Sequence, residues 1–298
     1  MSGLSKFPIT PMKRDGQIAA DALRGLIARL CAAEVDSIGL LGSTGTHTDL
    51  ARKERRRALA LALEETGGRL PVVVGVGALR TDEDVRLAQD SKALGAAGLL
   101  ATVSYAPSRR MKSSSTSRPL PMRAVCQSFI YDNPGTTHFR FTPALVGRLA
   151  KVSGTVAIKN PTDKSDEIGG HLAGQRGITP DDFSIGYSGD WNATEAMICG
   201  ADTWYSVLAE GGHAQHLSPH RNGCSNRRYC RSAPARCRPE PVWDLFRQFS
   251  SLRSVYALAD SLGISQAEPP RPILPLSELA QAQDCLLPFP YSAGCFSA

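Results

Sequence analysis

A lysine closes one of the apolar runs of this sequence, at a place where its amine could react. Residues 155–158 predict a buried strand, and Lys159 ends it. Lysine is seldom buried without a partner, and removal from water disfavours its charged form. A neutral amine condenses with a ketone to give a Schiff base, whose protonated nitrogen accepts electrons while a carbon–carbon bond forms or breaks. For Lys159 taken alone, a cation that reaches solvent at a strand end is the alternative.

Other reactive side chains follow apolar runs in the same way. Tyr131 ends the run before that of Lys159 and is a candidate proton shuttle. The segment 42–46 supplies hydroxyls and glycine N–H groups ahead of a predicted helix, an arrangement that suits a carboxylate. A core tyrosine and an ordinary turn are the alternatives for each feature alone, but their joint placement favours a site. The side chains that follow apolar runs in this way are Ser43, Thr44, Tyr105 and Tyr131.

The rest of the sequence alternates short apolar runs with helical patterns. The runs are apolar throughout rather than at every second position, which is typical of parallel strands covered on both faces. The apolar runs are residues 7–11, 36–42, 71–77, 97–103, 127–132, 155–159, 183–189 and 202–208. The helical patterns are residues 15–33, 48–66, 81–96, 142–152 and 190–200, with Thr48 and Thr81 as predicted N-caps.

Eight strand–helix steps within about 210 residues predict an α/β protein, a (β/α)8 TIM barrel with extra C-terminal helices. A doubly wound sheet is the alternative, but no G-x-G-x-x-G motif lies between a strand and a helix. In a barrel of this kind the active site lies at the carboxyl ends of the strands. Residues that are distant in sequence, among them Ser43, Tyr131 and Lys159, would therefore converge on one mouth.

Composition indicates a soluble cytoplasmic protein. The 298 residues contain no run of 18 apolar residues, and the N-terminus has no apolar stretch of signal-peptide length, so we expect neither a membrane span nor export. Eight cysteines are present without a C-x-x-C pair, and we expect them to be reduced thiols.

The net charge of +6 comes from two basic segments. Residues 108–123 carry five basic residues and no acidic one, and residues 209–240 carry six arginines against two glutamates, so the remainder is mildly acidic. A basic arm for RNA or a Cys/His metal knuckle is one interpretation. However, Cys224, Cys230 and Cys237 do not have the spacing of a structural zinc site. We therefore expect no metal site and no nucleic-acid partner.

Residues 108–126 and 209–240 have no helical periodicity where a barrel needs outer helices, and residues 284–298 are similarly irregular. Pro119 and Pro121 break helices. An ordinary loop of this length is uncommon in a compact barrel. Our hypothesis is that these segments are translated out of frame. Resequencing the gene in independent clones tests it, and an uninterrupted frame through both segments would contradict it.

Six motifs occur along the chain in the order FPITPM, GLLGSTG, PVVVGVG, FIYDNPGTTHF, VAIKNP and GYSGD. In this order and spacing they resemble the dihydrodipicolinate synthase / N-acetylneuraminate lyase family of Schiff-base aldolases. The resemblance covers most of residues 5–208 and resumes at residues 241–264. It implies a barrel that acts on pyruvate or a related 2-keto acid together with an aldehyde, without a cofactor, in a homo-oligomer (a dimer or tetramer).

Carried over by position, the resemblance implies roles for the residues at the predicted mouth. Lys159 matches the Schiff-base lysine, and Tyr131 matches the catalytic tyrosine. Ser43 and Thr44 match the hydroxyl pair that binds the keto-acid carboxylate and relays protons, and Gly45 lies beside them in the same loop.

Other positions match the family less closely. Tyr105 is the candidate for a tyrosine supplied by a neighbouring subunit, and Tyr205 falls where a backbone carbonyl faces the substrate. The family's hydroxyl loop normally ends in Gly-Glu, whereas Thr46 follows the glycine here. Thr136 stands where the true synthases have an arginine that grips the second substrate, and Arg140 is the nearest replacement. These departures argue against dihydrodipicolinate formation itself.

The sequence therefore predicts an enzyme, a carbon–carbon lyase that forms a Schiff base with a 2-keto acid and uses an aldehyde as second substrate. The competing hypothesis is a barrel that its disrupted outer helices leave as a non-catalytic scaffold, and an RNA-binding protein acting through residues 209–240 is a third. We expect the barrel to cover residues 1–225, with irregular parts near 108–126 and from 209. A helical extension is expected over residues 240–298.

Overall fold

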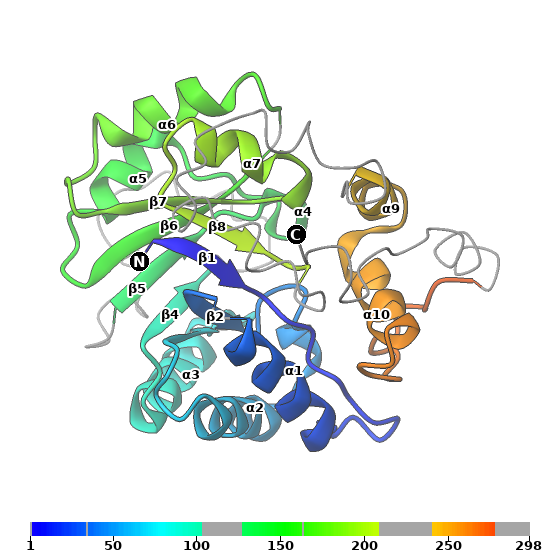
Figure 1. Cartoon of the computed structure of the whole chain (residues 1–298). Helices are drawn as coiled ribbons and strands as arrows, with labels where there is room; N and C mark the ends of the chain where they lie inside the picture. Colours follow the sequence, from blue (N-terminus) through cyan, green and yellow to red (C-terminus); the bar gives the residue numbers. More distant parts are fainter. Residues whose placement is uncertain (1, 34, 103–126, 163, 209–239, 278–298) are drawn as a thin grey trace.

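Eight parallel strands form a closed barrel in chain order, which confirms the predicted (β/α)8 fold (Figure 1). The computed structural model describes residues 2–33, 35–102, 127–162, 164–208 and 240–277. The two segments thought to be out of frame, and most of the tail after them, lie outside these ranges. The strands are β1 (Gly3–Lys6), β2 (Ser37–Leu40), β3 (Val72–Gly75), β4 (Gly98–Ala101), β5 (Gln127–Tyr131), β6 (Thr155–Pro161), β7 (Ser184–Ser188) and β8 (Thr203–Ser206).

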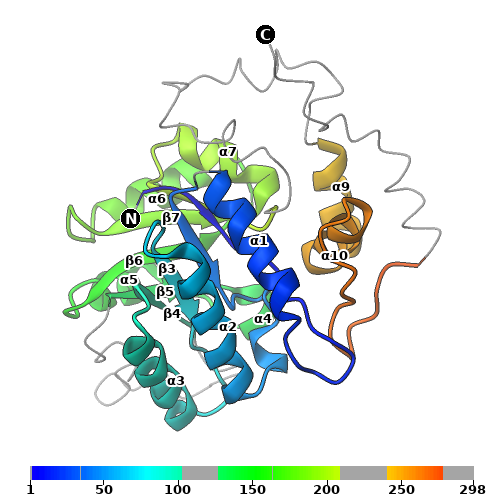
Figure 2. The same cartoon turned by 60° about the horizontal axis from the view of Figure 1, so that its bottom comes forward.

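Helices cover the outside of the barrel on two sides. In both views α1, α2 and α3 lie side by side along one side of the barrel, while α5, α6 and α7 cover the other (Figures 1 and 2). The helices before residue 208 are α1 (Ala20–Ala32), α2 (Arg52–Thr66), α3 (Thr81–Leu94), α4 (Pro134–Thr137), α5 (Pro143–Leu149), α6 (Ile168–Arg176) and α7 (Asp190–Ile198). A short 3-10 helix, η1 (His47–Asp49), precedes α2.

Several details differ from the sequence prediction. Thr81 is the first residue of α3 rather than its N-cap, which is Arg80. The first strand is Gly3–Lys6 rather than residues 7–11, because Pro8 and Pro11 have no N–H to give to a sheet ladder. The predicted helix 48–66 is interrupted after η1, so α2 begins at Arg52 and Thr48 does not cap it. Helix α6 was not predicted, since its three glycines weaken the helical pattern.

Aromatic rings fill the inside of the barrel, and glycines on neighbouring strands make room for them. A Cβ atom added to Gly39 of β2 would lie 2.1 Å from the Phe7 ring, and one added to Gly186 of β7 would lie 2.4 Å from the Tyr205 ring. The inward cluster thus depends on the absence of side chains at these two positions. Its buried members are Phe7, Val73, Leu100, Phe129, Tyr131, Ala157 and Tyr205.

Replacing Gly39 by alanine is expected to destabilise the fold by about 1–3 kcal/mol, the usual cost of overpacking a core. The new methyl group must displace the Phe7 ring, and this rigid ring cannot bend away as the end of a flexible side chain could. Gly25 on the exposed face of α1 is the matched control, because a Cβ there meets no atom within 4 Å. Gly25→Ala should be neutral or stabilising by up to about 1 kcal/mol. Urea denaturation measures both, and equal stabilities of the two variants would contradict this packing.

Two further helices, α9 (Glu240–Phe249) and α10 (Ser251–Ser261), pack beside the barrel. They lie beyond the carboxyl ends of β1 and β8 (Figure 1). The Tyr256 hydroxyl donates a hydrogen bond of 3.2 Å to the carbonyl oxygen of Thr10, which follows β1. Within the described residues, helices α9 and α10 thus contact the barrel. The shared apolar cluster contains Ile9, Leu26, Leu208, Val242, Trp243, Phe246, Val255, Tyr256, Leu258 and Ala259.

Candidate active site

Lys159 lies inside the barrel, near the carboxyl end of β6. It pairs in register with Tyr131 of β5 and with Gly186 of β7. Its side chain is 4% exposed, so the alternative of a solvent-directed cation is wrong. Alternation along β6 explains the burial, because Ala157 and Lys159 face the barrel interior while Ile158 joins the helix-side core.

Aromatic faces surround the Lys159 amine. Its Nζ lies 4.1 Å from the centre of the Tyr131 ring, 4.5 Å from that of Phe7 and 6.0 Å from that of Tyr205. None of the ion pairs among the described residues includes Lys159. The amine thus lies among ring faces and, within the described residues, has no carboxylate as an ion-pair partner.

The Tyr131 hydroxyl connects two polar side chains at the mouth. It lies 2.9 Å from Ser43 Oγ and accepts a hydrogen bond of 2.9 Å from Asn133 Nδ2. The structure therefore brings the predicted Tyr131 and Ser43 together beside Lys159. Asn133 was not predicted as a site residue. Its position two residues after Tyr131, on the same side of an extended chain, was the available signal.

The loop that carries Ser43 and Thr44 is held at several points. Thr10 Oγ1 donates a hydrogen bond of 2.8 Å to the carbonyl oxygen of Gly45, so the segment that follows β1 is linked directly to the loop. Thr44 is 5% exposed, and a Cβ at Gly45 would approach the Leu41 backbone to 3.0 Å. These contacts fix a rigid loop, in which the hydroxyls are pre-positioned rather than ordered on binding.

Tyr205 and Tyr105, the other two predicted tyrosines, are not among the side chains that the structure shows around the Tyr131 hydroxyl. Tyr205 is buried inside the barrel. Its ring packs edge-on against the Phe7 ring, with 5.8 Å between the centroids. Burial raises the pKa of the Tyr205 phenol above its ordinary value, so this hydroxyl stays neutral. Tyr105 lies outside the described residues. Phe7, which sequence reasoning placed within a strand, instead lies beside the Lys159 amine.

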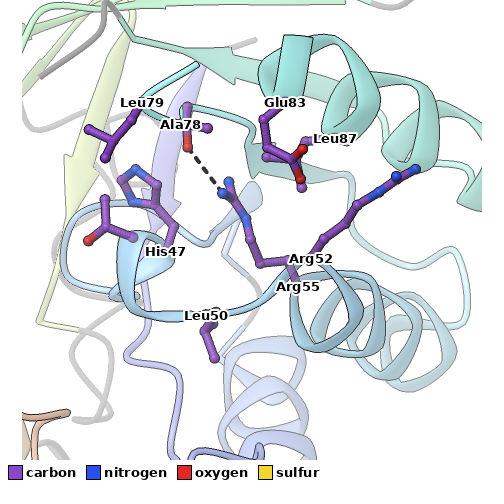
Figure 3. A pocket seen from close by; sticks show the side chains of 10 residues that line it. His47, Leu50, Arg52, Arg55, Ala78, Leu79, Glu83 and Leu87 are labelled. Carbon is purple, nitrogen blue, oxygen red and sulfur yellow. Dashed lines mark hydrogen bonds between the residues drawn. The ribbon is translucent and has the colours of Figure 1, made fainter. Parts of the chain in front are cut away.

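A separate cavity of about 400 Å³ lies between the segments that follow β2 and β3. Figure 3 shows His47 and Arg55 among the side chains that line it. The Arg55 guanidinium donates to the carbonyl oxygens of Gly75 (2.8 Å) and Gly77 (3.1 Å), and so braces the end of β3. His47 Nδ1 donates to the Gly42 carbonyl oxygen at 3.1 Å and braces the hydroxyl loop.

His47 should make the fold sensitive to acid. Burial, and then the nearby Arg55 charge, lower the pKa of His47 from 6.5 to about 4. The unfolded chain therefore takes up a proton at a higher pH than the folded chain. Stability is fully present above pH 6.5 and falls as the pH drops towards 4, by about 3 kcal/mol at about 1.36 kcal/mol per pKa unit.

The variant His47→Asn tests this, since an amide keeps a donor for the Gly42 carbonyl oxygen but does not titrate. Denaturant unfolding at several pH values should give the variant a shallower loss of stability between pH 6.5 and pH 4. The same loss in both proteins would show that His47 is not the cause.

The described part of the chain has no group of three or more His, Cys, Asp or Glu side chains arranged to hold a metal ion. Within the same residues, no helix is long and apolar enough to span a membrane.

Comparison with known proteins identifies the family. The model of the Dihydrodipicolinate synthetase family matches residues 1–283. A 4-hydroxy-tetrahydrodipicolinate synthase of Methylococcus capsulatus is 35% identical over 191 residues, which is 64% of each chain. The synthase of the same name from Salinibacter ruber is 31% identical over 211 residues, or 70% of this chain and 68% of its own.

A solved structure agrees with this assignment. The crystal structure of dihydrodipicolinate synthase from Agrobacterium tumefaciens superposes with a TM-score of 0.86 and 42% sequence identity, over 96% of both chains. The alignment with the Methylococcus synthase spans only 64% of that protein's length, whereas the structural match is nearly complete. The chain belongs to the dihydrodipicolinate synthetase family.

Proposed function

We propose that the protein is a Schiff-base-forming aldolase or lyase, with pyruvate or a related 2-keto acid as one substrate and an aldehyde as the other. The observation that carries this proposal is the buried Lys159 amine, enclosed by aromatic faces and adjacent to the Tyr131–Ser43 hydrogen bond. Membership of a family whose relatives are named as synthases supports it.

Each side chain then has a part in the reaction. The Lys159 amine attacks the keto carbon through its nitrogen lone pair, and loss of water gives a protonated imine. Tyr131, through Ser43, moves protons to and from the departing oxygen and the carbon next to the imine. Removal of the C3 proton gives an enamine that adds to the aldehyde carbon, and water then hydrolyses the imine to release the product and the free amine. The lyase direction runs these steps backwards.

The keto-acid carboxylate is placed at the segment that follows β2. Ser43 and Thr44 offer hydroxyls there. Thr10, in the segment after β1, bonds to the loop at Gly45, and His47 bonds to it at Gly42. A rigid set of donors binds a carboxylate with less loss of conformational freedom than a loop that must first order. This supports carboxylate binding by the hydroxyl loop.

Thr136 bears on which aldehyde the protein can bind. This residue stands on α4, where the resemblance implies an arginine in the true synthases, and its hydroxyl donates to the Asn133 carbonyl oxygen at 3.3 Å. Arg140, the nearest arginine in sequence, has an exposed side chain. We therefore expect the second substrate to be an aldehyde whose binding does not require a guanidinium at position 136.

We further propose a cytoplasmic homo-oligomer, a dimer or tetramer, in which a neighbouring subunit supplies Tyr105 to the relay. Light scattering on the full chain measures the assembly. A monomer with full activity would contradict the shared relay, because each active site would then be complete within one chain.

The non-catalytic alternative has no support from the comparisons or from the site, where Lys159 Nζ lies over the Tyr131 ring and the Tyr131 hydroxyl bonds to Ser43. A panel of aldehydes incubated with pyruvate and the full chain tests the function. We expect consumption of pyruvate with at least one aldehyde, and no consumption without protein. Failure with every 2-keto acid and aldehyde, in both reaction directions, would favour the scaffold.

A further inference from the structure

We propose that Asn133 is a positioning residue that fixes the direction of the hydrogen bond between Tyr131 and Ser43. This inference rests on the proposed function. Asn133 Nδ2 lies 2.9 Å from the Tyr131 hydroxyl, which also lies 2.9 Å from Ser43 Oγ.

The backbone holds Asn133 in place for this contact. Its carbonyl oxygen accepts the N–H groups of Thr136 (3.1 Å) and Thr137 (3.0 Å), which start helix α4, and also the Thr137 hydroxyl at 3.0 Å. Residue 133 is therefore the N-cap of α4, but its side chain makes no capping hydrogen bond. The amide instead extends to the Tyr131 hydroxyl, so the helix start orients a side chain toward the reaction site.

A donor at this point determines where the phenol proton lies. An amide N–H can only donate, so the Tyr131 oxygen accepts from Asn133. We infer that the Tyr131 O–H then points at Ser43 Oγ, the other hydroxyl within hydrogen-bond distance. The chain of bonds then runs in one direction, from Asn133 through Tyr131 to Ser43. The same N–H stabilises the negative charge that develops on the phenol oxygen when Tyr131 gives up its proton.

Asn133 thus acts through Tyr131 and is needed for proton transfer but not for attack by Lys159. The two steps can be measured separately. Exchange of the pyruvate C3 protons for deuterium, followed by NMR, reports proton transfer in the enamine step. Reduction with borohydride in the presence of pyruvate reports formation of the imine at Lys159.

Two substitutions distinguish the effect of the Asn133 hydrogen-bond donor from the effect of the volume that its side chain fills. Asn133→Asp keeps the size but replaces the donor by an acceptor, and Asn133→Leu removes all hydrogen bonding. We expect both to lower the rate of C3 exchange by about 10- to 100-fold, less than the 10²- to 10⁴-fold typical of a group that transfers the proton itself, because Asn133 acts through Tyr131. The yield of trapped adduct should stay within about twofold of the original protein. In Asn133→Asp the exchange profile should also move to higher pH, because a nearby carboxylate opposes a phenolate.

Gln89→Glu is the control for the charge change, since Gln89 is exposed on α3, far from the mouth. Unchanged exchange in both Asn133 variants would overturn the proposal. So would exchange in Asn133→Asp that exceeds that of Asn133→Leu by tenfold, because an acceptor would then suffice and the bond chain would run the other way. Absence of any trapped adduct in the original protein would instead refute the proposed function.

Discussion

Replacement of Lys159 by methionine should abolish the covalent adduct with pyruvate and lower turnover by at least about 10³-fold, the scale on which loss of a covalent nucleophile is measured. Methionine has a similar length and no amine, so it fills the same space among the rings of Tyr131 and Phe7. Among the described residues that surround Lys159 Nζ, none carries another amine that could form the imine in its place.

The same substitution should leave the fold as stable as before, or more stable. A buried amine without an ion pair is costly to keep in the interior, and a thioether is not. Lys151→Ala, which changes an exposed lysine at the turn before β6, should retain full labelling and full turnover. Thermal unfolding, steady-state rates and intact mass after borohydride measure these outcomes together. Turnover above a tenth of the original in Lys159→Met would rule out the imine mechanism.

Replacement of Tyr131 by phenylalanine should lower turnover by about 10²- to 10⁴-fold, the usual contribution of a positioned general acid–base group. The hydroxyl is the shared partner of Ser43 and Asn133, and its removal breaks the relay at its centre. The ring remains over the Lys159 amine at the same place, so the imine should still form, but more slowly.

Tyr187→Phe is the matched control on a nearby strand. The Tyr187 hydroxyl bonds to His171 Nδ1 at 2.8 Å in the layer between the barrel and α6, away from the interior. This variant should lose some stability, about 1 kcal/mol for one hydrogen bond, but keep its rate of pyruvate C3 exchange. Equal exchange rates in Tyr131→Phe and the original protein would remove Tyr131 from the mechanism.

The sequence predicted the barrel and the central residues because these depend on local patterns. Apolar runs of strand length and the residue types at their ends placed Lys159, Tyr131 and Ser43 at one mouth, and the closed sheet confirms that their strands share an end. The strand-end position predicted a site at the mouth, and the structure adds that Lys159 faces the barrel interior by alternation with Ile158 along β6. Such signals lie within a few residues of each other and need no long-range information.

The remaining features depend on contacts between distant segments. Phe7 lies beside Lys159 only because β1 ends at Lys6 and Gly39 of β2 leaves space for the ring, a relation that no local pattern encodes. The role of Asn133 required the distance to Tyr131 and the start of α4 together. Tyr105 falls outside the described residues, so its part in the relay stays a prediction.

Borohydride reduction of the full chain with pyruvate, followed by peptide mass mapping, tests the central claim most directly. Only an imine between an amine and the keto carbon is converted into a stable secondary amine. We expect a single modified peptide, the one that contains Lys159, with the mass of one reduced pyruvate, and no label in Lys159→Met. Labelling at another lysine, or no labelling by any 2-keto acid at full protein integrity, would contradict a Schiff-base mechanism at Lys159.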